Sequence, residues 1–254
     1  MKLPENAFKR GLDAGRQQIG LWVTIPDPSV VEALAGAGYD WLLLDSEHTP
    51  VEAAQILPLL QATAAYPVST LVRPAANDTV LIKRYLDMGA QTLLLPYIQS
   101  RAEAEAAVAA VRYAPEGVRG VSGIMRASRF GRVDGYLKQA AREICLVLQI
   151  ETRRGLDNLE EIASVDGVDG IFIGPADLST SMGYAGDSAH PKVIAAIEDA
   201  IARLKAIAKP SGILTLDPAF AHHCINLGTT FTGVGVDLGL LVRAADDLAG
   251  SFKA

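Results

Sequence analysis

The stretch from Leu146 to Ser179 reads LVLQIETRRGLDNLEEIASVDGVDGIFIGPADLS and has the pattern of a strand, a helix and a second strand. The apolar runs at 145–150 and 170–173 are too short for helices, whereas residues 156–163 between them have helical spacing. A strand–helix–strand unit of this length predicts two parallel strands that lie side by side in one sheet.

A carboxylate follows the end of each predicted strand, Glu151 after the first and Asp177 after the second. The carboxyl ends of neighbouring parallel strands meet, so we expect the two carboxylates to converge. Together with the backbone amides of Gly174, Ala176 and Asp177, they suit Mg²⁺ or Mn²⁺ with coordination positions left open for a substrate. The alternative is that both are ordinary loop and helix-cap residues, and their spacing alone leaves both interpretations open.

The same alternation of short apolar runs and helical segments extends through the chain. The predicted strands are residues 20–25, 41–44, 68–72, 92–95, 145–150, 170–173, 212–216 and 231–236. The predicted helices are 6–14, 29–37, 51–64, 78–88, 101–112, 156–163, 190–208, 218–227 and 240–252, with a long loop at 114–134. Continuous apolar strands alternating with helices predict a parallel sheet that is covered on both faces.

About eight such repeats in 254 residues is the size of an α/β fold of the (β/α)₈ TIM-barrel type. We therefore expect a single TIM-barrel domain spanning residues 1–254, with a short N-terminal helix ahead of the first strand. A doubly wound open sheet is the second choice, although no glycine-rich dinucleotide fingerprint or phosphate-binding loop follows any predicted strand.

Composition excludes several classes of function. A net charge of −6 gives no electrostatic support for binding nucleic acid. Cys145 and Cys224 lie in apolar patterns, which favours core packing over a disulfide or a metal site. The N-terminal residues lack the apolar centre of a signal peptide, and no apolar run approaches the ~20 residues of a membrane helix. We expect a soluble cytoplasmic protein with no membrane partner.

Polar side chains follow the predicted strands at the edge where barrel enzymes place their active sites. Gln149 interrupts an apolar strand two residues before Glu151, so the two side chains point the same way. The other candidates each follow a strand and are Asp45, His48, Arg73 and Asp177. Together they provide ligands for a hard metal, a cation and a titratable imidazole, although each alone has a plain structural explanation.

Four motifs resemble the metal-dependent (class II) pyruvate aldolases of the HpcH/HpaI family. They are LLLDSEHTP (42–50), STLVRP (69–74), QIET (149–152) and IFIGPADLSTSMGY (171–184). The resemblance extends from IGLW at 19–22 to GVGVD at 233–237. It implies reversible cleavage of a 4-hydroxy-2-oxo acid, such as 4-hydroxy-2-oxoheptanedioate, to pyruvate and an aldehyde such as succinate semialdehyde. It also implies a place in the breakdown of aromatic compounds and a homohexamer built as a trimer of dimers.

The resemblance assigns the metal and the pyruvate to the central unit. It implies that Glu151 and Asp177 hold Mg²⁺, Mn²⁺ or Co²⁺, among which an oxygen-only site discriminates weakly. Gln149 and the backbone of Gly174, Pro175 and Ala176 are then expected to contact the pyruvate. No Schiff base or organic cofactor is implied, and the candidate lysines Lys83 and Lys138 lie in helical or loop segments.

The resemblance also implies roles for the charged residues beside this unit. Arg73 stabilises the enolate oxygen, and His48 is the general base. Asp87 matches an aspartate that raises the basicity of this histidine, yet it lies near the end of a helix that runs away from the active face. It therefore either reaches His48 of a neighbouring subunit or is an ordinary helix-end acid near Arg84. Asp45 is the alternative partner within the chain, or an acceptor for a metal-bound water.

The sequence determines the identity of the aldehyde less well than that of the other reactants. Leu216 and the segment TLDPAF (215–220) are the expected lining of its pocket. The loop 119–132 has two interpretations: it places Arg126 or Arg129 over the site to receive a distal carboxylate, or it is a solvated or interface loop. Alternative functions are a 2-dehydro-3-deoxyglucarate-type aldolase, a CoA-ester lyase of the citrate lyase β-subunit type, and an inactive metabolite-binding barrel.

Overall fold

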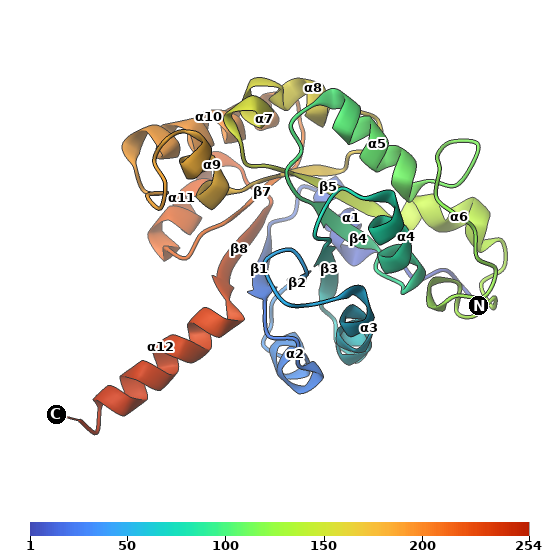
Figure 1. The fold of residues 1–254 in the computed structure, drawn as a ribbon, viewed down its shortest axis with the longest axis horizontal. Helices are drawn as coiled ribbons and strands as arrows, with labels where there is room; N and C mark the ends of the chain where they lie inside the picture. Colours follow the sequence, from blue (N-terminus) through green and yellow to red (C-terminus); the bar gives the residue numbers. More distant parts are fainter. Residues whose placement is uncertain (254) are drawn as a thin grey trace.

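The computed structural model describes residues 1–253, and across these residues eight parallel strands close a barrel in chain order (Figure 1). Each strand pairs with the next, and β8 pairs with β1. The strands are β1 (Gln18–Val23), β2 (Trp41–Asp45), β3 (Ser69–Arg73), β4 (Thr92–Leu95), β5 (Cys145–Ile150), β6 (Gly170–Ile173), β7 (Ser211–Leu214) and β8 (Phe231–Val236). The predicted TIM barrel is confirmed, and closure of the sheet excludes the doubly wound alternative.

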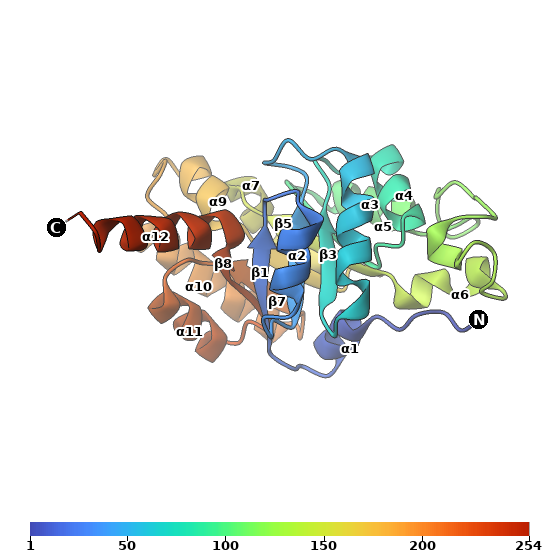
Figure 2. The same ribbon diagram turned by 90° about the horizontal axis from the view of Figure 1, so that it is seen from below.

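Helices surround the barrel (Figures 1 and 2). The helices up to β5 are α1 (Ala7–Asp13), α2 (Pro28–Ala35), α3 (Ala53–Ala62), η1 (Thr63–Ala65), α4 (Thr79–Asp87), α5 (Arg101–Val111), η2 (Arg126–Ser128) and α6 (Tyr136–Glu143). Those after β5 are α7 (Arg153–Asp157), α8 (Leu159–Ala163), α9 (Pro175–Ser181), α10 (Pro191–Ala206), α11 (Pro218–Leu227) and α12 (Asp237–Gly250). Side-chain caps start several of them, including Asn6 for α1 and Asp78 for α4.

Alternation along the strands separates two apolar cores. In β2, Leu42 and Leu44 face outward into the core beneath the helices, whereas Trp41 and Leu43 face into the barrel. Phe8 of α1 closes the barrel's amino-terminal end, with its ring centroid 6.3 Å from that of Trp41. A Cβ atom on Gly20 would lie 2.0 Å from the Trp41 ring, so the barrel interior requires glycine at that position.

The same alternation positions the site. The inward series that begins with Trp41 and Leu43 continues to Asp45, and Leu71 is followed by Arg73. Asp45 and Arg73 are direct partners in the register of β2 and β3. In β5, the inward Val147 is followed by Gln149. Polar side chains thus replace apolar ones at the carboxyl end of each of these strands.

α12 leaves the barrel and extends away from it (Figures 1 and 2). Its start is fixed by Asp237, whose carboxylate accepts hydrogen bonds from the backbone N–H and the hydroxyl of Thr24 and from the N–H of Ile25. Several of its apolar side chains are exposed, among them Leu241 and Leu248. Over residues 1–253, no helix is long and apolar enough to cross a membrane.

Two local predictions were wrong, and a helix before β5 was not predicted. The helix predicted at 156–163 is two short helices, α7 and α8, because the Asn158 side chain between them donates a 2.8 Å hydrogen bond to the carbonyl of Gln99. The segment between the loop predicted at 114–134 and β5 was not assigned to an element and contains a helix, α6, whose Glu143 accepts the backbone N–H of Asn6. The helix predicted to begin at residue 29 begins at Pro28, because Asp27 caps it.

Candidate active site

A cavity of about 510 Å³ opens at the carboxyl ends of the strands. Its lining includes the predicted residues His48, Arg73, Gln149, Glu151, Gly174, Pro175, Ala176, Asp177 and Leu216. Its size is typical of a small-molecule site. Asp45 lies behind Arg73, and Asp87 is elsewhere. Most of the residues predicted from their positions after the strands therefore lie in one cavity.

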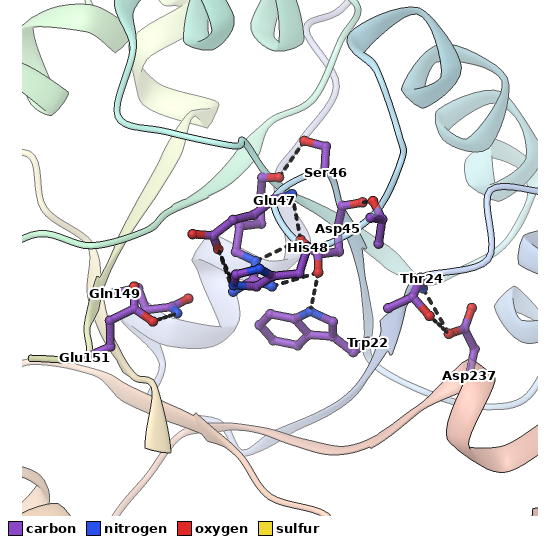
Figure 3. A network of polar contacts seen from close by, with 11 residues as sticks. Trp22, Thr24, Asp45, Ser46, Glu47, His48, Gln149, Glu151 and Asp237 are labelled. Atoms are coloured by element: carbon purple, nitrogen blue, oxygen red, sulfur yellow. Dashed lines mark hydrogen bonds and ion pairs between the residues drawn. The ribbon is translucent and has the colours of Figure 1, made fainter. Parts of the chain in front are cut away.

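Glu151 is buried and held from two sides. The Gln149 amide donates to its Oε2 (Figure 3), and the backbone N–H of Tyr97 donates to its Oε1 over 2.7 Å. Burial raises the pKa of Glu151 to about 7, partly opposed by these two hydrogen bonds and reinforced by the charges of Glu47 and Asp177. A cation bound beside Glu151 would therefore favour its ionised form.

The donors around Glu151 suit a hard divalent cation. Asp177, in the first turn of α9, is a second carboxylate close enough to affect the pKa of Glu151. A Cβ on Gly174 would lie 2.8 Å from Oε2 of Glu151, so glycine keeps this space open. The buried Oε1 of Gln149 has no hydrogen-bond partner among residues 1–253. Over that range no three His, Cys, Asp or Glu side chains form a metal-binding group, so two carboxylates would leave positions for water and substrate.

Arg73 is held in one orientation. Its Nε and Nη2 donate to the two oxygens of Asp45 over 2.9 and 2.7 Å, and Nη1 lies 2.8 Å from Oε2 of Glu47. Its guanidinium lies 5.0 Å from the centroid of the Trp22 ring. Burial raises the pKa of Asp45, but the hydrogen bonds and charge of Arg73 outweigh that effect and lower it. Asp45 accepts two hydrogen bonds from the guanidinium, whereas Oε2 of Glu47 is an ion-pair partner that accepts no hydrogen bond within residues 1–253, so the N–H groups not bonded to Asp45 remain for a ligand.

Glu47 is a residue that the sequence analysis did not assign. It lies beside Arg73, and its charge acts on Glu151. Burial raises the pKa of Glu47, whereas the charge of Arg73 lowers it. Its position two residues after Asp45 could have predicted that it belongs to the site, since residues at that spacing share a side of an extended chain.

His48 lies at the mouth of the cavity, and its side chain is 63% exposed. Its Nε2 is 3.8 Å from Oε2 of Glu47 (Figure 3). Asp45, the alternative partner within the chain, instead binds Arg73 and accepts hydrogen bonds from the Trp22 indole and the Glu47 backbone. The pairing of Asp45 with His48 is therefore wrong for the described chain, because the β2–β3 register places Asp45 against Arg73.

Asp87 ends α4 and binds Arg119, whose Nη2 donates to its Oδ1 over 2.8 Å. Arg119 is buried, and its guanidinium lies 4.5 Å from the centroid of the Tyr113 ring. The basic neighbour of Asp87 is therefore Arg119, not Arg84 as expected. Within residues 1–253 Asp87 does not contact His48, in keeping with a helix that runs away from the active face.

The expectation that Arg126 or Arg129 covers the site of its own barrel is wrong. Nη1 of Arg126 donates to the carbonyl of Met88 over 2.8 Å, and Nη2 to the carbonyl of Leu60. Both arginines line a separate cavity of about 420 Å³, together with residues at the start of β3 and β4. The carbonyls at the ends of α3 and α4 hold this part of the loop at the opposite end of the barrel.

Comparison with known proteins agrees with this geometry. A family model described as HpcH/HpaI aldolase/citrate lyase matches residues 18–244. A pyruvate aldolase from Rhizobium etli is 60% identical over 252 residues, 99% of each chain. A 4-hydroxy-2-oxo-heptane-1,7-dioate aldolase from Salmonella dublin is 53% identical over 251 residues, 98% of this chain and 95% of the other. The crystal structure of an HpcH/HpaI aldolase/citrate lyase family protein from Burkholderia cenocepacia J2315 superimposes with a TM-score of 0.94 at 38% identity, covering 98% of this chain and all of the other.

Proposed function

The chain belongs to the HpcH/HpaI aldolase/citrate lyase family and is a carbon–carbon lyase, and we propose that it is a divalent-metal-dependent (class II) pyruvate aldolase. Its proposed reaction is the reversible cleavage of a 4-hydroxy-2-oxo acid, of which 4-hydroxy-2-oxoheptanedioate is one example, to pyruvate and an aldehyde. Closure of all eight strands into one barrel supports a single aldolase domain over residues 1–254.

One observation carries this proposal. Buried Glu151, with its raised pKa, lies with Asp177, Gln149 and Arg73 in one cavity at the strand ends. Glu151 and Asp177 would hold Mg²⁺, Mn²⁺ or Co²⁺, which when bound supplies a Lewis acid for the 2-oxo acid and the positive charge that Glu151 lacks. The unpartnered Oε1 of Gln149 would accept a hydrogen bond from a water in the same site.

The chain's own residues account for the movement of charge and protons. Cleavage of the C3–C4 bond leaves the electron pair on the pyruvate fragment, with negative charge on its C2 oxygen. The N–H groups of Arg73 that are not bonded to Asp45 would donate to that oxygen, and because Asp45 and Glu47 already fix the guanidinium, little reorganisation is required. His48 would remove the proton from the C4 hydroxyl of the substrate, and the pyruvate enolate would then take up one proton at C3 to give pyruvate.

Lysine-based chemistry has less support. A Schiff-base aldolase needs a lysine amine in the cavity, and none of the lining residues in the described part of the chain is a lysine. Pyruvate therefore has a cationic partner in Arg73 but no amine to attack it.

Asp87 has a proposed role between subunits. It lies far along α4 on the side of Arg119, and the resemblance pairs it with the histidine that His48 matches. We propose that it contacts His48 of a second copy in a homohexamer, a trimer of dimers, with the exposed apolar residues of α12 contributing to contacts between copies.

The test uses the exchange of pyruvate methyl protons for deuterium in D₂O, which requires enolisation but no aldehyde. Exchange should stop on treatment with chelator and return when Mg²⁺, Mn²⁺ or Co²⁺ is added in excess. Glu151→Ala and Asp177→Ala should remain folded by circular dichroism and be inactive. Exchange that survives complete metal removal, or borohydride trapping of pyruvate on a lysine, would overturn the proposal.

A further inference from the structure

The cavity has a second wall beside the carboxylates, because β7 is the strand next to β6. Leu214 and Leu216 at the end of β7, Phe220 of α11 and Ile194 of α10 line this wall. These side chains are apolar, and Leu216 is 56% exposed at the mouth of the cavity. If pyruvate is held between Glu151, Asp177 and Arg73, as proposed above, the aldehyde fragment must extend along this second wall.

Within residues 1–253, this wall contains no lysine or arginine. Among the lining residues of the described chain, Arg73 is the one lysine or arginine, and Asp45 and Glu47 already neutralise it. The acidic lining residues are Glu151, Asp177 and Asp217. The positive charge of a metal ion held by Glu151 and Asp177 would be balanced by these two carboxylates and by the pyruvate carboxylate. A second carboxylate, on the tail of the aldehyde, would therefore meet apolar side chains, the neutral side chains of Ser188 and Thr215, and the negative charge of Asp217, but, within the described chain, no cation to pair with.

The helix terminus beside the wall does not provide an anion site either. The N-terminus of α11 lies next to Leu216, and such termini attract anions through their unpaired N–H groups. Here Pro218 occupies the first position and has no N–H, and the Asp217 carboxylate accepts the N–H of Ala219 over 2.9 Å. The chain's own carboxylate thus occupies the position that a substrate carboxylate would take.

We propose that this cavity accepts succinate semialdehyde, the aldehyde formed from the example substrate above, less well than aldehydes of the same length with an uncharged tail. The inference rests on the proposed aldolase function and assigns selectivity to the wall formed by Leu214, Leu216 and Phe220, with Asp217 at its edge. A carboxylate tail loses its hydration on this wall and gains no ionic partner. An uncharged tail of the same length has a much smaller desolvation free energy.

The test compares succinate semialdehyde with its amide, 4-oxobutanamide, which has nearly the same shape and no charge. Initial rates of aldol addition to pyruvate are measured with the metal-loaded enzyme. We expect kcat/KM to be at least about tenfold higher for the amide, a discrimination within the range of a pocket that leaves one polar group unpaired. Equal values, or a preference for succinate semialdehyde, would overturn the inference and indicate that a cation from outside this lining reaches the tail.

Two variants locate the effect. Leu216→Arg places a guanidinium at the mouth of the wall and should raise the ratio of kcat/KM for succinate semialdehyde to that for the amide at least fivefold. Leu137→Arg adds the same charge on exposed α6 and should leave the ratio at its wild-type value. If Leu216→Arg, folded by circular dichroism, fails to change the ratio, the wall does not set the selectivity.

Deuterium exchange into pyruvate, measured in parallel, separates the two proposals. If the enzyme exchanges deuterium into pyruvate but uses the two aldehydes equally well, the proposed selectivity is refuted and the proposed aldolase function is not. Absence of exchange with any metal refutes the aldolase function and the selectivity together.

Discussion

The inner wall of the cavity and its rim are built in opposite ways. The inner wall is Arg73, Gln149 and Glu151, which lie on or directly after strands, are buried, and are fixed by hydrogen bonds. The rim is His48, Leu216 and Asp217, which lie on loops and are exposed. His48 and Leu216 are 63% and 56% exposed, respectively.

This difference separates two tasks. Groups fixed by the barrel are in place before the substrate arrives, so they can stabilise developing charge without reorganisation. Exposed groups on loops acquire most of their contacts when a substrate or another subunit arrives. We infer that the inner wall performs the pyruvate chemistry, whereas the rim completes the proton transfer and selects the aldehyde. Substitutions in the two regions should therefore differ in size and in kind.

The largest effect is expected in the inner wall. Arg73→Lys keeps the charge but loses the fork that binds Asp45 through two atoms and Glu47 through a third. Removing a preorganised donor costs ~10²–10³ in rate, so kcat and deuterium exchange should both fall by about that factor. Arg101→Lys, in an exposed ion pair on α5, is the matched control and should change neither. Near-normal turnover by Arg73→Lys would show that the fork does not bind the enolate oxygen.

A second prediction concerns the cost of burying Glu151 without metal. Its pKa is raised from 4.5 to about 7 in the folded protein. The contribution of Glu151 to stability is therefore fully present below pH ~4.5, is lost as the pH rises to about 7, and leaves the metal-free fold destabilised above that. Glu151→Gln removes the buried charge, and the Gln149 amide is able to flip and accept from the new side chain through its unpartnered Oε1.

In excess chelator, the melting temperature of Glu151→Gln should exceed that of the wild type by about 5 °C at pH 8.5, for a destabilisation of a few kcal/mol. The difference should be much smaller at pH 5. Glu116→Gln, at an exposed position, should show no such pH-dependent gain. A gain that is equal at both pH values would indicate that ionisation of Glu151 is not its cause.

The third prediction tests the proposal that another subunit supplies Asp87 to the rim of the cavity. Asp87→Asn should lower kcat about tenfold and leave metal binding unchanged. This is less than the ~10²–10⁴-fold attributed to a general acid–base group itself, because Asp87 acts through His48. A mixture of His48→Ala and Asp87→Asn chains, dissociated and reassembled, should recover part of the activity because some sites then receive both native residues. Mixed assemblies no more active than their parents would place Asp87 outside the site, as a partner of Arg119 alone.

The parts of the fold that could be predicted best from the sequence are those buried in the barrel. The bounds of β4, β5, β6 and β8 were predicted correctly because strands buried on both faces are continuous apolar runs. Helices α6 and α9 were missed because contacts distant in sequence, such as Glu143 with Asn6, help to fix short segments of this kind.

The residue types of the inner wall were also visible in the sequence, since each follows a buried strand. Their pairings were not. That Asp45 binds Arg73 depends on the β2–β3 register, and that Asp87 binds Arg119 depends on how the loop after α5 returns to α4. Periodicity places a residue on a face of an element but does not identify its neighbour on the next element.

The smallest expected effect belongs to the rim. Leu216→Ala removes an apolar side chain that is 56% exposed, so at most part of its surface becomes buried when an aldehyde binds. At ~0.8 kcal/mol per buried CH₂ group, partial loss of this contact should lower kcat/KM about three- to fivefold for an aldehyde long enough to reach it. Butanal should therefore be affected more than acetaldehyde, whose tail ends before the second wall. Deuterium exchange into pyruvate, which involves no aldehyde, should fall less than addition to butanal. A uniform loss across both aldehydes and exchange would mean that Leu216 supports the pyruvate side, and the division between inner wall and rim would not hold at this residue.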